Sequence, residues 1–111
     1  MRAMCSESNI QVYNMFSSYT DSLVDRLGAG SLSSQEFATW GRQENTWSGP
    51  GGKQSDGHTD RIDYIFYHLR SQSSVRTAET VHHAVLEKKW RGMSLSDHSW
   101  VEAHIRITFN I

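Results

Sequence analysis

Three groups of residues have the types and the spacing that acid–base chemistry needs. Asp63 is an acid within the otherwise apolar run 61–67, where a buried carboxylate without a partner would be costly. An acid and an imidazole follow one another at Asp97 and His98, and the polar segment 45–48 reads Asn-Thr-Trp-Ser. These groups are the candidates for catalysis, metal binding and substrate binding.

Asp63 and His98 lie far apart in the chain, so only the fold can bring them together. If their strands are neighbours, Asp63 can meet His98 across the sheet. A carboxylate that accepts from an imidazole N–H fixes the tautomer of the ring and makes its other nitrogen a better base. Extended backbone would point Asp97 away from His98, and a hard carboxylate suits Mg²⁺ or Mn²⁺. On spacing alone, a structural role for these acids stays open beside the catalytic one.

The other histidines favour solvated or hydrogen-bonded roles. His82 and His83 are adjacent, so in a strand they would face opposite sides and make poor co-ligands for one metal ion. His104 falls on the more solvated face of the last expected strand. The one cysteine, Cys5, allows no internal disulfide and no cysteine-based metal cluster. We therefore expect these histidines to be solvated or hydrogen-bonded and Cys5 to be an inert thiol.

A helix and a long loop should come first along the chain. Residues 9–27 carry apolar side chains at helical spacing and are followed by Gly28, which predicts an amphipathic helix that is broken near residues 20–21. Residues 28–60 are rich in turn formers and hold two of the tryptophans, which predicts a long loop. The apolar stripe of the helix comprises Ile10, Tyr13, Phe16, Leu23 and Leu27.

Three strands should follow. Residues 61–67 are rich in β-branched and aromatic side chains, residues 75–86 form a weaker candidate, and residues 99–109 alternate regularly. The short connections favour antiparallel pairing in an α+β fold. The face of the last strand that we expect to be buried comprises Val101, Ala103, Ile105, Ile107 and Phe109.

Composition narrows the classes further. The chain has 111 residues and a formal net charge of −1, which argues against a basic domain held to nucleic acid mainly by phosphate contacts. Hydrophobic residues make up 37% of the chain, so the core should be small. No apolar run approaches about 20 residues, and we expect no signal peptide because the first nine residues lack an apolar stretch. The compartment stays open, with the cytoplasm as the default.

The order and spacing of two motifs resemble the C-terminal end of the endonuclease/exonuclease/phosphatase superfamily. Residues 60–67 read Asp-Arg-Ile-Asp-Tyr-Ile-Phe-Tyr, and residues 94–98 read Ser-Leu-Ser-Asp-His, ahead of the final alternating strand. Residues 39–48 resemble the loop before that first motif in the neutral sphingomyelinase branch. Residues 18–22, Ser-Tyr-Thr-Asp-Ser, are similar to the helix end that precedes this loop.

The resemblance implies a fold, a reaction and a site. The fold would be the C-terminal portion of a four-layer α/β/β/α sandwich with mainly antiparallel strands. The reaction would be Mg²⁺-dependent phosphodiester hydrolysis, and in this branch sphingomyelin yields ceramide and phosphocholine. His98 would handle the proton at the scissile phosphate, Asp63 would orient His98, and Asp97 would lie near the metal and the nucleophile. Asn45 and Trp47 are the candidate substrate contacts.

Four further features of the family have no match here. They are an asparagine on the first strand, a metal-binding glutamate, a middle histidine and an aspartate-x-asparagine motif, and all precede the matched region. Residues 1–20 contain none of them in matching surroundings. We therefore expect residues 1–111 to be a partial domain without its N-terminal metal-site portion, with Asp97 as its one metal ligand. Because Mg²⁺ needs several oxygen ligands, we expect negligible turnover by this chain.

Alternative functions stay open. The chain could belong to a DNA endonuclease or exonuclease, or to an inositol-phosphate phosphatase, of the same superfamily, although its charge and residues 45–48 favour DNA less. It could instead be a non-catalytic interaction remnant that binds through its tryptophan-rich loop. Trp40 and Trp47 could contact a membrane surface, since indole is favoured at lipid interfaces, or they could simply pack within the loop. The oligomeric state is not indicated.

Overall fold

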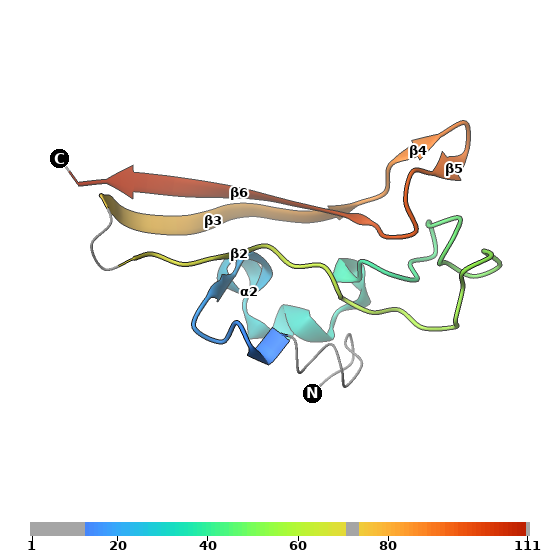
Figure 1. Ribbon diagram of the computed structural model, residues 1–111, viewed down its shortest axis with the longest axis horizontal. Coiled ribbons are helices and arrows are strands. Elements are labelled where there is room, and N and C mark those ends of the chain that lie inside the picture. The colour runs from blue at the N-terminus through green and yellow to red at the C-terminus, as the bar shows by residue number, and fades with distance from the viewer. Residues whose placement is uncertain (1–12, 71–73, 111) are drawn as a thin grey trace.

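The chain combines α-helix with antiparallel β-sheet (Figure 1). The computed structural model describes residues 13–70 and 74–110. These residues form three two-stranded antiparallel sheets, β1–β2, β3–β6 and β4–β5, so the expected α+β class is confirmed. The elements in order are β1 (Thr20–Asp21), α2 (Ser22–Leu27), 3₁₀ turns at Ala29–Ser33 and Gln35–Phe37, β2 (Phe66–Tyr67), β3 (Val75–Leu86), β4 (Lys89–Trp90), β5 (Met93–Ser94) and β6 (Trp100–Phe109).

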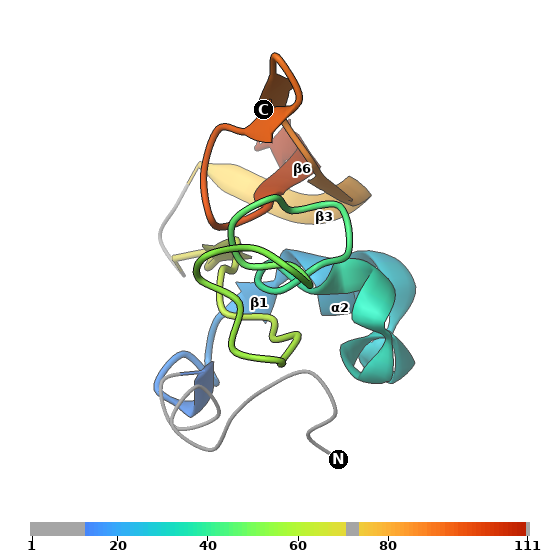
Figure 2. The same cartoon turned by 90° about the vertical axis from the view of Figure 1, so that its right-hand side faces the viewer.

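The β3–β6 pair forms the longest ladder among the described residues and confirms the two strands expected at 75–86 and 99–109. Its register runs from Val75 opposite Phe109 to Leu86 opposite Trp100, with two irregular steps on the way. One face of the pair packs on α2, and both views show it as a separate layer above the helix and the loop (Figures 1 and 2). In the segment that connects β3 to β6, β4 and β5 form a small hairpin. Its two-residue turn, Arg91–Gly92, has positive φ at both positions, as a type I′ turn requires.

The predicted helix over residues 9–27 is much shorter in the structure. The helix α2 begins at Ser22, because the Asp21 side chain accepts from the Leu23 N–H (3.0 Å) and the extended backbone of Asp21 caps it. The expected break is confirmed, because Thr20 and Asp21 pair with β2 as strand β1. Gly28, with φ of 86°, ends the helix as predicted. The part of the prediction at residues 9–12 lies outside the described residues.

The predicted strand over 61–67 is also shorter, since only Phe66 and Tyr67 pair in a ladder. The backbone ahead of them is satisfied in another way. The N–H groups of Ile62 and Asp63 both donate to the Thr39 hydroxyl (3.0 and 3.1 Å). The Thr39 hydroxyl therefore provides the acceptor that a neighbouring strand would otherwise supply, because a backbone N–H group needs an acceptor but not necessarily one from a strand.

The core is small, as the composition predicts, and most of the buried side chains in the described residues are polar. Among the described residues, Leu23 and Ala38 are the fully buried hydrophobic ones. The outer end of β6 is wetter than its alternation predicts: Ile107 and Phe109 are 48% and 60% exposed, while the earlier members of that face are half-buried. No helix in the described part of the chain is long and apolar enough to span a bilayer. The buried polar side chains are Asp21, Ser22, Thr39, Asn45, Ser48, Arg61, Thr80, His83, Ser94 and Ser99.

Candidate acid–base site

Asp63 and His98 form a hydrogen-bonded carboxylate–imidazole dyad. Asp63 Oδ2 lies 2.5 Å from His98 Nδ1, and the two side chains are 40% and 37% exposed. The contact needs the tautomer in which Nδ1 carries the proton and donates it to the carboxylate. Nε2 then has no hydrogen-bond partner among the described residues. Asp63 therefore fixes one ring nitrogen of His98 and leaves the other available for a different hydrogen bond.

An intervening segment lies between the two halves of the dyad, so Asp63 and His98 meet without their segments being direct neighbours. Trp40 makes an isolated antiparallel bridge to Asp60 on one side and to His98 on the other. The Trp40 ring also packs edge-on against the imidazole, with 5.3 Å between ring centroids at 75°. Trp40 therefore sets the spacing between the two segments that carry Asp63 and His98, and its contact with lipid stays a prediction.

Thr39 connects both halves of the dyad, and sequence reasoning missed it. It is 1% exposed. Its hydroxyl accepts from the Asp63 N–H (3.1 Å), and its carbonyl accepts from the N–H of Ser99 (2.7 Å), the residue after His98. A threonine at the start of the Thr-Trp-Gly segment was the only signal in the sequence. A single residue thus fixes the backbone on both sides of the site.

Gly41 closes the loop behind this junction. Its φ is 78°, and a Cβ at this position would lie 1.9 Å from the carbonyl oxygen of His58. Its N–H donates to the hydroxyl of Ser48 (3.0 Å), which is buried. Both the backbone conformation and the close approach require glycine here.

Asn45 organises the loop rather than facing solvent. It is 2% exposed, its amide N–H groups donate to Glu87 Oε1 (3.0 Å) and to the Ser96 carbonyl (2.9 Å), and its amide oxygen accepts from the N–H groups of Trp47 and Ser48 (2.9 Å each). These bonds tie the loop to the segment that leads into His98. The structure therefore buries Asn45 within the loop, and its contact with substrate stays a prediction.

Asp97 and Trp47 line one open hollow of about 370 Å³ beside the dyad segment. The Trp47 indole N–H donates to the Ser94 carbonyl (2.8 Å), and the Ser48 hydroxyl donates to the Asp97 carbonyl (2.7 Å). The candidate residues thus fall into two pairs, Asp63 with His98 and Asp97 with Trp47, joined by the peptide bond between Asp97 and His98. The other residues that line the hollow are Gln54, Ser94, Leu95 and Ser96.

A buried ion pair anchors the segment that carries Asp63. The Arg61 guanidinium donates two hydrogen bonds of 2.6 Å to the Asp21 carboxylate, and the side chains are 2% and 4% exposed. Tyr13 donates to the same carboxylate (2.8 Å). Burial, reinforced by the hydrogen bond to Asp21, raises the pKa of Tyr13 to about 12. The start of α2 is thereby tied to the backbone two residues before Asp63.

His83 joins β3 to α2. Its Nδ1 lies 2.8 Å from the Ser22 hydroxyl, and both residues are buried. Burial lowers the pKa of His83, and the positive charge of Arg61 adds to the effect. His83 therefore faces the interior, and its neighbour His82 faces the opposite side of the strand, as the adjacency predicted.

The Mg²⁺ ion that the resemblance implies does not fit the described residues by themselves. Mg²⁺ takes near-octahedral oxygen ligands, mostly carboxylates and water. In the described part of the chain, Asp97 does not belong to any cluster of three or more acidic, histidine or cysteine side chains that could hold a metal ion. One carboxylate is too little to hold this ion firmly.

Comparison of the chain with protein-family models, with curated proteins and with solved structures found no match. Its function is therefore inferred from its own motifs and geometry.

Proposed function

We propose that this chain carries the proton-transfer part of a phosphodiesterase of the endonuclease/exonuclease/phosphatase superfamily, nearest to its neutral sphingomyelinase branch. The single observation that carries the proposal is the 2.5 Å contact between Asp63 and His98. Two motifs that resemble the same superfamily hold these residues, and the fold brings them together across a third segment. In this proposal the β3–β6 pair belongs to one sheet of the four-layer sandwich.

The proposed chemistry adds one water across a P–O bond. The water oxygen bonds to phosphorus, the bond to the alcohol oxygen breaks, and one proton passes from the water to the leaving alcohol. His98 Nε2 is positioned to hold that proton, because Asp63 occupies the other ring nitrogen and stabilises the imidazolium. A positioned acid–base group of this kind contributes about 10²–10⁴-fold to a rate.

Sphingomyelin at a membrane surface is the proposed substrate. Its support is the resemblance of residues 39–48, whose Trp47 lines the hollow beside Asp97. Mg²⁺ remains part of the proposal through the resemblance.

Binding at the dyad provides the test. The tag-free chain is titrated with phosphocholine, inositol monophosphate and a thymidine dinucleotide, while ¹H–¹⁵N spectra follow the histidine rings. We expect phosphocholine to saturate a site that shifts the Nε2 resonance of His98 and leaves Nδ1 protonated. His98→Gln should abolish the binding, and His58→Gln, in the exposed loop, should not.

Each other result decides against part of the proposal. A larger response to the dinucleotide or to inositol phosphate would move the substrate to another branch of the superfamily. If no phosphate ester shifts the His98 ring, or if His98→Gln leaves the binding intact, the dyad has a structural role only.

A further inference from the structure

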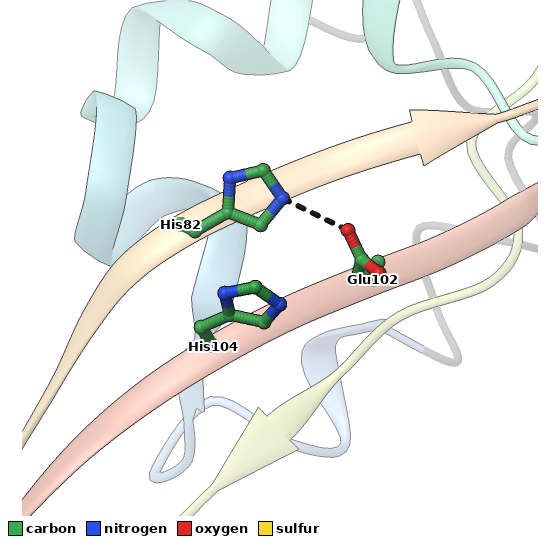
Figure 3. Close-up of side chains that lie close together, drawn as sticks. All are labelled: His82, Glu102 and His104. Carbon is green, nitrogen blue, oxygen red and sulfur yellow. Dashed lines mark hydrogen bonds and ion pairs between the residues drawn. The ribbon is translucent and has the colours of Figure 1, made fainter.

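The outer face of the β3–β6 pair carries a cluster of potential metal ligands that the acid–base site does not use. His82 projects from β3, and Glu102 and His104 project from β6 on the same side (Figure 3). One ligand atom from each side chain lies within 4.8 Å of those of the other two. His82 Nε2 is 3.0 Å from Glu102 Oε2, and the two imidazole rings are 4.5 Å apart at their centroids.

A β-bulge creates this cluster. Thr80 pairs with Ile105, but His82 pairs with His104, so one extra residue of β3, Val81, lies between the two pairs. With an unbroken ladder Val81 would stand opposite His104, and His82 would face the side on which His83 contacts α2. The bulge reverses the alternation and brings the two imidazoles to directly opposed positions. Bulges commonly re-aim side chains at functional sites.

The donor set selects the class of metal. Two imidazole nitrogens and one carboxylate oxygen suit Zn²⁺, Cu²⁺, Ni²⁺ or Fe²⁺, whereas Mg²⁺ and Ca²⁺ prefer oxygen ligands alone. Three protein ligands are also the number found at open zinc sites, where the fourth position holds water or a substrate. The cluster is thus distinct in chemistry from the Mg²⁺ centre that the superfamily resemblance implies.

The distances leave little to rearrange. In a tetrahedral zinc site with bonds of about 2.0–2.1 Å, ligand atoms lie about 3.3 Å apart. The pair His82–Glu102 already lies near this spacing at 3.0 Å. No two of the three ligand atoms are more than 4.8 Å apart, so the widest separation must close by at most about 1.5 Å. The side chains of His82 and Glu102 are 42% and 45% exposed, so a rotation of χ angles can supply that closure without repacking.

We propose that His82, Glu102 and His104 bind one Zn²⁺ ion per chain and that this ion crosslinks β3 to β6. The site does not depend on the proposed phosphodiesterase activity.

Calorimetry on the tag-free Cys5→Ser chain, which removes the one thiol as a competing ligand, tests the stoichiometry and the ligands. We expect ZnCl₂ to bind at one ion per chain and MgCl₂ to give no heat at the same concentration. Substituting His82→Gln, Glu102→Gln or His104→Gln should each weaken Zn²⁺ binding at least about tenfold. His58→Gln is the matched control and should bind Zn²⁺ like the parent.

Two measurements on the unsubstituted site keep the test independent of how the variants fold. Zn²⁺ should shift the ring resonances of His82 and His104 together, and it should slow amide exchange in the β3–β6 ladder beside them. Absence of Zn²⁺ heat, ring shifts confined to other histidines, or unchanged affinity in His104→Gln would each overturn the proposal.

Discussion

Asp21→Asn tests how far the buried ion pair supports the segment that carries Asp63. The substitution keeps the shape of the side chain and an oxygen that can still cap α2, since asparagine is as good an N-cap as aspartate. It removes the negative charge that faces the Arg61 guanidinium at 2.6 Å in a pair that is 2% and 4% exposed.

The expected loss follows from that burial. Removing one partner of a buried ion pair costs about 3–5 kcal/mol, because the remaining charge keeps its desolvation penalty. Because the amide oxygen of asparagine can still accept a hydrogen bond from Arg61, we expect Asp21→Asn to lower the free energy of unfolding by about 3 kcal/mol, the lower end of this range. Domains of this size are stable by about 5–15 kcal/mol, so the variant should remain folded. With a urea dependence of about 1–3 kcal/mol/M, its unfolding midpoint should fall by about 1–3 M.

Urea titration followed by tryptophan fluorescence measures the midpoint. Glu79→Gln is the control, because it removes a carboxylate from an exposed pair with Arg106 whose side chains are 59% and 64% exposed. Exposed pairs contribute about 0–1 kcal/mol, so this midpoint should hardly move.

The double variant Asp21→Asn/Arg61→Met separates charge from packing. Removing both charges leaves no buried ion, so its loss should be smaller than the sum of the two single losses by about 2 kcal/mol. Equal shifts in Asp21→Asn and Glu79→Gln, or strictly additive losses in the double variant, would refute the reasoning.

Three further outcomes are expected. With Mg²⁺ present, the chain should turn over neither sphingomyelin nor plasmid DNA above background, because the described residues do not assemble the ligands of that ion; turnover that is lost in His98→Ala would contradict this expectation. Since burial lowers the pKa of His83 from 6.5, its contribution to stability is present above that pH and is lost as the pH falls through the lowered value. The urea midpoint should thus fall as the pH is lowered below 6.5, and less so in His83→Gln. Gly41→Ala should lengthen the Asp63–His98 contact and destabilise the chain by about 1–3 kcal/mol, seen as a lower urea midpoint and exchange broadening of the His98 ring, because a Cβ there meets the His58 carbonyl at 1.9 Å. Unchanged spectra in that variant would show that the loop junction does not position the dyad.

The sequence predicts those parts of the fold that depend on local pattern. Alternation located the last strand, 99–109, nearly to the residue, the weaker candidate at 75–86 matches β3, and Gly28 marked the end of α2. The motifs also brought Asp63 and His98 together as predicted. Local order is readable because side-chain periodicity and turn chemistry act over a few residues.

What could not be predicted depends on partners distant in the chain. Nothing near Thr39 indicates that its hydroxyl replaces a strand, and nothing near Arg61 indicates that its charge is buried. The cluster of His82, Glu102 and His104 depends on one extra residue in β3, and a shift of one residue exchanges the two faces of a strand. Register therefore decided which histidines meet.

The bridging position of Trp40 also bears on the order of folding events. The β3–β6 hairpin closes over a short connection. The dyad instead requires the segments that carry Trp40, Asp63 and His98, which span a much longer stretch of chain, to come together. Closing a longer loop costs more conformational entropy and is slower, so the hairpin should form first and the Asp63–His98 contact should form last. During refolding, the quenching of Trp40 by the imidazole would then lag behind the gain of β-structure, so the candidate catalytic contact itself would report that the molecule has finished folding.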